Sequence, residues 1–459
     1  MRRIGRLRLR SSLEIAASRV SIGFECVERG VIKPEKCYDL LGASGVKHAR
    51  CQTGWAVCEK EKGVYDFSWL DDIVDNLLRR GVQPWFNVGY GNPVYMENAS
   101  NPTAVGCVPL LYGEAVMQAW LAYVRALARH FQGRVCYFEI WNEPDIPAFW
   151  YPGEPDAGQY ARLVEATGAV IRQIIPDAKI GASYAKRWWS PYLGDFAREI
   201  AQGTLNFFCF HAYTMTPEAH FLEDVQGIRD AFEMQGKTGI ALWQGESGYP
   251  SYFPPNHWLH PKGQGSERQQ AVWQLRRFLL DCASGTEMTS FFQAADMMER
   301  PYAMARSVTD PYKVARHGIL NGLTYTPKKS YDTIRCLSVL LSGEVRPMAR
   351  AFTLSYAESA HADLTAVKLP LEINGNAVYA YFLPTDIEEE AGIERAAVLG
   401  LKGAEALKRP MLVDPFLNEA YLLETEDICR TGDRTLYRRL PIGEYPVLLC
   451  EHGAFEIEE

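Results

Sequence analysis

The fold is decided by residues 137–144, which read Tyr-Phe-Glu-Ile-Trp-Asn-Glu-Pro. The segment begins as an apolar, aromatic run, which is typical of a buried parallel strand. Pro144 lacks a backbone N–H and ends the strand pairing. The carboxylate of Glu143 is therefore expected at the carboxyl end of a strand, and in a barrel of parallel strands that end carries the chemistry.

The same alternation of strand and helix patterns extends outward from this stretch over residues 18–342. Amphipathic segments with helical spacing, such as 69–80, 115–131, 159–175, 269–282 and 330–341, separate short apolar runs. The eight candidate strands are 20–24, 46–51, 83–88, 135–140, 179–183, 205–211, 239–244 and 288–293. Eight such units predict an α/β fold, a (β/α)8 TIM barrel, and disfavour a doubly wound sheet.

The pattern changes after residue 342. Short strand-like runs at 351–356, 363–369, 377–383, 396–401, 420–423 and 447–450 are separated by turn signals such as Asn374-Gly375. This pattern predicts a C-terminal β-sandwich over residues 343–459. Residues 6–9 also resemble a strand, so residues 1–17 could join the sandwich rather than the barrel.

Composition excludes several classes of function. The net charge of −8 argues against a nucleic-acid partner, and no apolar run is long enough to predict a membrane span. The eleven cysteines are odd in number and scattered, which indicates reduced thiols in a reducing compartment. The basic N-terminus is not followed by an apolar segment, so we expect no secretory signal and a cytoplasmic location.

No cofactor is implied by the sequence, and no metal site is expected. His257 and His260 are close together, but no acidic or cysteine residue accompanies them at ligand spacing. The sequence is compatible with a homo-oligomer.

Several predicted strands end in polar side chains that meet at one rim of the barrel. The second strand leads into Arg50, the sixth ends at His211 with Tyr213 following, and the seventh leads into Glu246. Glu143 and Glu246 are thus two carboxylates at the same rim. Glycoside hydrolysis needs such a pair, because one acid protonates the leaving oxygen and one carboxylate meets the positive charge at the anomeric carbon.

The surroundings of the two carboxylates predict different protonation states. Arg50 and Tyr213 can keep Glu246 ionised by charge and hydrogen bonding. Glu143 follows Trp141 and loses water when a sugar binds, so it can keep its proton. Asn142 is well placed to contact a sugar 2-hydroxyl group. We expect Glu139 to be a structural carboxylate inside the barrel, because a buried charge needs partners.

These motifs resemble the clan A glycoside hydrolases, with family 39 the most similar. The likeness rests on Trp-Asn-Glu-Pro at 141–144 and Gln-Gly-Glu at 244–246, and it extends to residues 45–52, 63–71 and 89–93. It covers residues 18–342. The resemblance implies retention of configuration through a covalent glycosyl-enzyme, with Glu143 as acid/base and Glu246 as nucleophile.

The resemblance also implies roles for neighbouring residues. Arg50 and Tyr213 match the partners of the nucleophile, His211 the histidine of the sixth strand, and Asn142 the 2-hydroxyl ligand. The clan often has a tryptophan after strand eight, where this chain has Phe-Phe-Gln at 291–293. That departure bears on which sugar is bound more than on the mechanism.

Further substrate-binding residues are expected at the rim. Aromatic faces stack on sugar rings, and amides bond hydroxyl groups. The candidates are Trp141, Gln244, Trp55, Asn92, Trp150 and Gln293. A long loop over residues 249–265, rich in proline and glycine, is a candidate substrate lid.

The expected partner is a carbohydrate, and the expected action is exo cleavage of small β-glycosides. Three alternatives stay open at this point: an endo-acting glycanase, a transglycosylase of the same clan, and a catalytically silent carbohydrate-binding barrel. The sandwich is expected to be structural or to form an oligomer contact.

Overall fold

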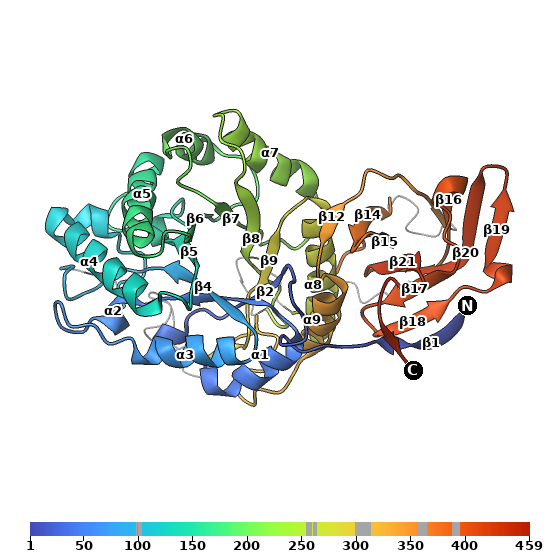
Figure 1. The fold of residues 1–459 in the computed structure, drawn as a ribbon, viewed down its shortest axis with the longest axis horizontal. Helices are drawn as coiled ribbons and strands as arrows, with labels where there is room; N and C mark the ends of the chain where they lie inside the picture. The colour runs from blue at the N-terminus through green and yellow to red at the C-terminus, as the bar shows by residue number, and fades with distance from the viewer. Residues whose placement is uncertain are drawn as a thin grey trace.

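The computed structural model describes residues 1–97, 99, 103–253, 259, 264–298, 314–356, 365–387 and 395–459. Two parts lie side by side in Figure 1: a barrel surrounded by helices, and a β domain that contains both chain termini. In the described part of the chain, no helix combines the length and apolar character needed to cross a membrane. All eleven cysteines are described; they are free thiols, and nine of them are buried.

Eight parallel strands close the barrel, which confirms the predicted fold class. They are β2 (Val20–Gly23), β3 (His48–Gln52), β4 (Gln83–Val88), β5 (Tyr137–Ile140), β6 (Lys179–Tyr184), β7 (Phe207–His211), β8 (Ala241–Ser247) and β9 (Met288–Phe291). Each coincides with a predicted strand. The largest difference is in β8, which continues past its predicted end to Ser247 and so carries Glu246 itself.

An irregularity in β8 explains how Glu246 reaches the rim. Phe210 of β7 pairs with Gln244, but the next residue, His211, pairs with Glu246, so the ladder skips Gly245. A Cβ at Gly245 would lie 2.9 Å from Cβ of Cys209, a distance that only glycine avoids. The extra residue turns Glu246 to the same side of the sheet as His211.

Helices cover the outside of the barrel (Figure 1). They are α1 (Tyr38–Ser44), α2 (Trp55–Cys58), α3 (Ser68–Arg79), α4 (Glu114–Phe131), α5 (Ala157–Ile174), α6 (Pro191–Glu199), α7 (Phe221–Glu233), α8 (Glu267–Ala283) and α9 (Lys329–Leu340). Three of them begin at side-chain caps: Asp156, Ser190 and Ser266 each accept a hydrogen bond from a backbone N–H in the first turn.

The β domain consists of an eight-stranded and a four-stranded antiparallel sheet, as predicted for the C-terminal segment. The larger sheet contains β12 (Val345–Pro347), β14 (Val367–Ile373), β15 (Asn376–Phe382), β21 (Val447–Glu451), β17 (Pro410–Asp414), β18 (Glu419–Leu422), β1 (Arg2–Leu7) and β22 (Ile457–Glu458). The smaller sheet contains β13 (Thr353–Tyr356), β16 (Arg395–Lys402), β20 (Arg434–Ile442) and β19 (Ile428–Thr431). A two-stranded ribbon, β10 (Met297–Met298) with β11 (Val314–Ala315), follows the barrel.

The first strand of the chain belongs to the β domain. β1 pairs with β18 on one side and with β22 on the other, so the barrel is inserted between β1 and the rest of its sheet. Helix α8 lies between barrel and β domain, and every residue from Gln269 to Cys282 is buried. A helix with no exposed face is typical of a position between two packed layers.

Candidate active site

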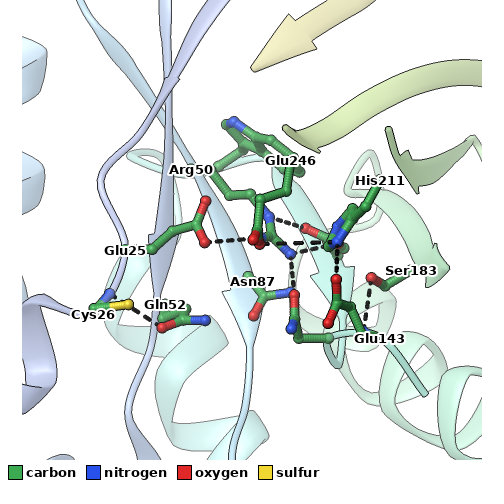
Figure 2. Close-up of polar contacts among 12 residues, drawn as sticks. Glu25, Cys26, Arg50, Gln52, Asn87, Glu143, Ser183, His211 and Glu246 are labelled. Atoms are coloured by element: carbon green, nitrogen blue, oxygen red, sulfur yellow. Dashed lines mark hydrogen bonds and ion pairs between the residues drawn. The ribbon is translucent and has the colours of Figure 1, made fainter. Parts of the chain in front are cut away.

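Arg50, at the centre of the rim, organises the carboxylates around it (Figure 2). Its Nη1 donates to Oε2 of Glu246 at 2.7 Å, while its Nε and Nη2 donate to Glu139 at 2.7 and 2.9 Å. Nη2 also donates to Oδ1 of Asn142 at 2.8 Å. Arg50 and Glu139 are fully buried, which confirms that Glu139 is a structural partner inside the barrel.

Glu246 has a second donor from the strand beside it. The hydroxyl of Tyr213, two residues after β7, donates to Oε1 of Glu246 at 2.9 Å. With Arg50 on Oε2, both oxygens of this carboxylate are fixed. A carboxylate held by charge-assisted bonds on both oxygens is oriented and kept ionised.

Glu143 lies opposite, against His211. Its Oε1 is hydrogen-bonded to Nδ1 of His211 at 2.7 Å. Glu143, His211 and Glu246 each offer one ligand-type atom, and these three atoms lie within 4.8 Å of one another. Carboxyl groups about 5–5.5 Å apart are typical of sites in which one carboxylate attacks the anomeric carbon directly.

The backbone around Glu143 is strained and held in place. Trp141 and Glu143 have φ angles of 67° and 46°, a region that costs a non-glycine residue about 1–3 kcal/mol. The carbonyl of Trp141 accepts a 2.6 Å bond from Nδ2 of the buried Asn87. The backbone N–H of Glu143 donates to Oγ of Ser183 at 3.2 Å (Figure 2). These bonds fix the turn that presents the carboxyl group.

The pKa values of the two carboxyl groups are shifted in opposite directions. Burial raises the pKa of Glu143, and the charge of Glu246 adds to this, against the opposing influence of His211. Burial would also raise the pKa of Glu246, but the charges of His211 and Arg50 outweigh burial, and its pKa is lowered. A pair of carboxyl groups separated in this way supplies one acid and one anion.

The cluster of Glu143, His211 and Glu246 has ligand atoms close enough to hold a metal ion. Arg50, however, is a fully buried cation 2.7 Å from Oε2 of Glu246. It competes for the carboxylate that a divalent ion would need, because two cations on one buried oxygen repel each other. The residues present therefore fit a site in which Arg50, in place of a metal ion, supplies the positive charge beside Glu246.

A family model places the chain among known sequences: the model for glycosyl hydrolases family 39 matches residues 44–345. The chain belongs to glycosyl hydrolase family 39. This family 39 chain is 26% identical over 198 residues to a β-xylosidase from Caldicellulosiruptor saccharolyticus, a match covering 39% of the chain and 38% of the relative. The alignment thus spans well under half of that curated relative.

Solved structures share the fold of this family 39 chain. A family 39 glycoside hydrolase from the gut symbiont Bacteroides cellulosilyticus WH2 superposes with a TM-score of 0.64 at 16% identity, over 94% of this chain and 80% of that one. A family 39 β-xylosidase from Caulobacter crescentus gives a TM-score of 0.56 at 16% identity, over 98 and 97%. The family assignment confirms the resemblance inferred from the sequence motifs.

Six of the predicted site residues come together in the family 39 chain. Hydrogen bonds join Arg50, Glu246, Asn142 and Tyr213 in one group and His211 with Glu143 in another, and Nδ1 of His211 lies 3.9 Å from Oε2 of Glu246 between them. Glu143 and Glu246 are each 12% exposed on the side chain; Arg50, His211 and Asn142 are more deeply buried, and Tyr213 is half-buried. This set was predicted because each member stands at or just past the carboxyl end of a predicted barrel strand.

Three predicted tryptophans do not present a face to substrate, which corrects the prediction. Trp55 is fully buried, stacked on Tyr123 and Tyr95, with its indole N–H donating to Glu59 at 2.6 Å. Trp150 is fully buried and packs edge-on against a tyrosine of α5. The indole of Trp141 is also buried, and its N–H donates to a backbone carbonyl at 2.8 Å. These three tryptophans are therefore part of the packed interior behind the rim.

The predicted amides also differ from expectation. Asn92 is fully buried, and its side chain bonds loop backbone at Glu59 and Val94, so it shapes a loop rather than a subsite. Gln244 is fully buried on the side of β8 shared with Phe210, facing the helices. Gln293 is fully buried next to Gly23. Phe292, beside it, packs edge-on against the ring of Tyr213.

Parts of the candidate lid lie outside the described residues, namely 254–258 and 260–263, which include His257 and His260. In the described part, Phe253 forms an antiparallel bridge to Gln264, and Tyr249 and Phe253 are buried. The base of the loop is thus packed against the protein.

Sequence reasoning missed two residues of the site. Asn87 holds the carbonyl of Trp141, and Glu25, which follows β2, contacts Arg50 at 2.8 Å. Glu25 is not part of any of the sequence motifs described above. It would have been found by asking of the first strand, as of the others, which side chain stands just past its carboxyl end.

Proposed function

We propose that this family 39 chain cleaves β-glycosidic bonds with retention of configuration, through a covalent glycosyl-enzyme on Glu246, and acts on the ends of small glycosides. The observation that carries the proposal is the spacing of the two carboxyl groups, whose facing oxygens fall within the 4.8 Å cluster around His211. A spacing of this order supports direct attack by the carboxylate, because inverting sites hold their carboxyl groups about 6.5–9.5 Å apart to admit a water molecule.

The residues of the network have separable roles in such a reaction. Glu143 donates its proton to the glycosidic oxygen while Oε of Glu246 attacks the anomeric carbon. In the second step Glu143, now ionised, removes a proton from water, which displaces Glu246 from the sugar. The bond from Arg50 fixes the amide oxygen of Asn142 and leaves its NH2 group to donate to the sugar 2-hydroxyl.

Exo action on a β-xyloside is supported by two observations. The curated relatives from Caldicellulosiruptor saccharolyticus and Geobacillus stearothermophilus are β-xylosidases. Each carboxyl side chain is only 12% exposed, which suits a substrate that inserts one terminal sugar better than a polymer lying across the rim. An aryl β-xyloside is therefore the first substrate to test.

The test is turnover of aryl β- and α-glycosides by wild type, Glu246→Ala and Glu143→Ala. We expect Glu246→Ala to be inactive. Glu143→Ala should lose about 10²–10⁴-fold on poor leaving groups, keep activity on good ones, and give a β-glycosyl azide when azide is added. The first anomer released by wild type, followed by NMR, should be β.

Different results would point elsewhere. An α-anomer as first product would overturn retention, and unchanged activity in both variants would overturn the assignment of the pair. Products longer than one sugar, or transfer to an added acceptor in place of water, would favour the endo-acting or transglycosylating alternatives. Polysaccharide binding without any turnover would favour the silent barrel.

A further inference from the structure

A third carboxyl group, Glu25, stands at the nucleophile. Its side chain is 1% exposed and points at Glu246 and Arg50 (Figure 2). Oε2 of Glu25 lies 2.8 Å from Nη1 of Arg50, and the same nitrogen lies 2.7 Å from Oε2 of Glu246. Because Oε2 of Glu25 and Oε2 of Glu246 lie on the same nitrogen, the two carboxyl groups are close neighbours. They therefore converge on one guanidinium nitrogen and on each other.

The charges around Arg50 do not balance if every carboxyl group is ionised. Its guanidinium carries one positive charge and contacts three carboxyl groups, those of Glu25, Glu139 and Glu246. Three anions around one buried cation repel one another strongly. One proton on this pair relieves the repulsion and lets one carboxyl group donate to the other, since two ionised carboxylates can only accept.

The proton belongs on Glu25 rather than on Glu246. Glu246 accepts from both Arg50 and Tyr213, and these donors stabilise its anion. Glu25 shares only the nitrogen that Glu246 already uses. The difference in hydrogen bonding makes Glu246 the stronger acid of the two.

We propose that Glu25 is a positioning residue that acts as a neutral carboxylic acid: it donates a hydrogen bond to Glu246 and so holds the nucleophile ionised and aimed at the substrate. The inference rests on the proposed function, because it assigns Glu246 the attacking role. The proton stays on Glu25 through both steps. When Glu246 leaves the sugar in the second step, the bond from Glu25 stabilises the carboxylate that re-forms.

Two further features of the site agree with this role. Burial raises the pKa of Glu25 well above its usual value, and the charge of Glu246 adds to the rise, against the opposing effect of Arg50. The chain also leaves space for the group: a Cβ on Gly23 would lie 2.9 Å from Oε1 of Glu25. The carboxyl group thus occupies a position that the strand leaves open for it.

Other titratable groups face the same pair from the surrounding elements and contribute to its titration. They are Cys26, Arg29, Arg50, Cys51, Tyr90, Glu139, Glu143, Cys209, His211 and Tyr213. Among these, Arg50 contacts both members of the pair and Tyr213 donates a hydrogen bond to Glu246. A substitution of Glu25 that keeps a neutral donor should therefore disturb the network least.

The test compares Glu25→Gln and Glu25→Ala by the pH dependence of kcat/KM on an aryl β-glycoside. Glutamine is neutral and keeps an N–H donor, so we expect activity within about threefold of wild type and an unmoved acidic limb. Alanine removes the donor from Glu246, so the acidic limb should move to higher pH by on the order of one unit. An acidic limb that moves to lower pH in both variants would show that Glu25 is ionised and would overturn the proposal.

The matched control is Glu28→Gln. Glu28 is another buried carboxylate three residues on, but it pairs with Arg29 at 3.0 Å instead of with the nucleophile. We expect its substitution to leave the acidic limb unchanged. An equal shift in this variant, or an unmoved limb in Glu25→Ala, would contradict a specific link between Glu25 and Glu246.

A measurement without turnover separates this proposal from the proposed function. In infrared difference spectra between wild type and Glu25→Gln at neutral pH, we expect to lose one carbonyl stretch of a protonated carboxyl group. If no aryl glycoside is turned over, the proposed function fails while this spectrum still tests the proton on Glu25. If the glycosidase activity is present but the band is absent in wild type, the proposal on Glu25 fails alone.

Discussion

Nδ1 of His211 lies 2.7 Å from Oε1 of Glu143. The same nitrogen lies 3.9 Å from Oε2 of Glu246, so one imidazole stands between the acid and the nucleophile. Burial lowers the pKa of His211, but the charges of Glu246 and Glu143 outweigh it and the pKa is raised. The imidazole therefore couples the two carboxyl groups electrostatically.

The first prediction is a bell-shaped pH dependence of kcat/KM. Glu246 must be ionised and its pKa is lowered, so activity should rise with pH through an apparent pKa below the usual 4.5. Glu143 must be protonated and its pKa is raised, so activity should fall through an apparent pKa above 4.5. Initial rates across the pH range test this, and the two values belong to the coupled pair. A single limb over the whole range would contradict it.

The second prediction concerns His211→Ala. His211 lowers the pKa of both Glu143 and Glu246, so its removal should raise both and move the entire bell to higher pH, by on the order of one unit. The same pH series on the variant measures the shift. Limbs moving in opposite directions would show that His211 does not act on both groups. His130→Ala is a control, because His130 pairs with Asp71 on the surface.

The third prediction concerns the strained turn before Glu143. Asn87→Ala removes the 2.6 Å bond to the carbonyl of Trp141 and leaves that buried oxygen without its donor. We expect a loss of about 1–3 kcal/mol in the free energy of unfolding, and a fall in kcat larger than any change in KM. Denaturant unfolding and steady-state kinetics measure both. Asn76→Ala, at a half-buried position on α3, should change neither.

The fourth prediction separates packing from substrate stacking at Trp55. Trp55→Phe breaks the bond from the indole N–H to the buried Glu59, which should cost about 1.5–3 kcal/mol of unfolding free energy. KM should not change, since the ring is fully buried. A raised KM with unchanged stability would restore the stacking role. Trp189→Phe, at a side chain 49% exposed, should leave stability within about 0.5 kcal/mol.

The fifth prediction concerns the joint between barrel and β domain. Arg276 of α8 is fully buried and donates to the carbonyls of Glu444 at 2.7 Å and of Thr385 at 3.1 Å. Arg276→Ala leaves these carbonyls, and the carboxylate of Glu218 at 3.1 Å from Nη1, without this partner and should cost about 3–5 kcal/mol. Calorimetry should show the loss. Arg346→Ala removes an exposed pair with Glu372 and should cost less than about 1 kcal/mol.

The barrel was predictable because each of its strands is a short apolar run followed by helical spacing. The carboxylates were predictable for the same reason: Glu143 and Glu246 stand where strands end, and the ends of parallel strands meet at one rim. The end of β8 differed most from its prediction, because the irregularity at Gly245 depends on the close approach of Cys209, which the local sequence does not reveal.

The tryptophans were not predictable in this way. Whether a ring such as Trp55 stacks on a sugar or on Tyr123 depends on which helix packs above it. The sequence next to Trp55 does not show which helix that is. Glu25 was missed for a related reason. A lone glutamate after a strand is ordinary in sequence, and its role emerges only when Arg50 and Glu246, distant along the chain, are placed beside it.

The pairing of β1 has a consequence for the order in which the protein is made. Arg3 of this strand bonds Glu419, 416 residues later, so β1 leaves the ribosome long before its partner strands exist. The barrel, which is continuous in sequence, can complete itself during synthesis, as domains commonly fold as units in N-to-C order. A strand that is translated before the barrel is therefore completed only after it, when β18 and β22 have been made.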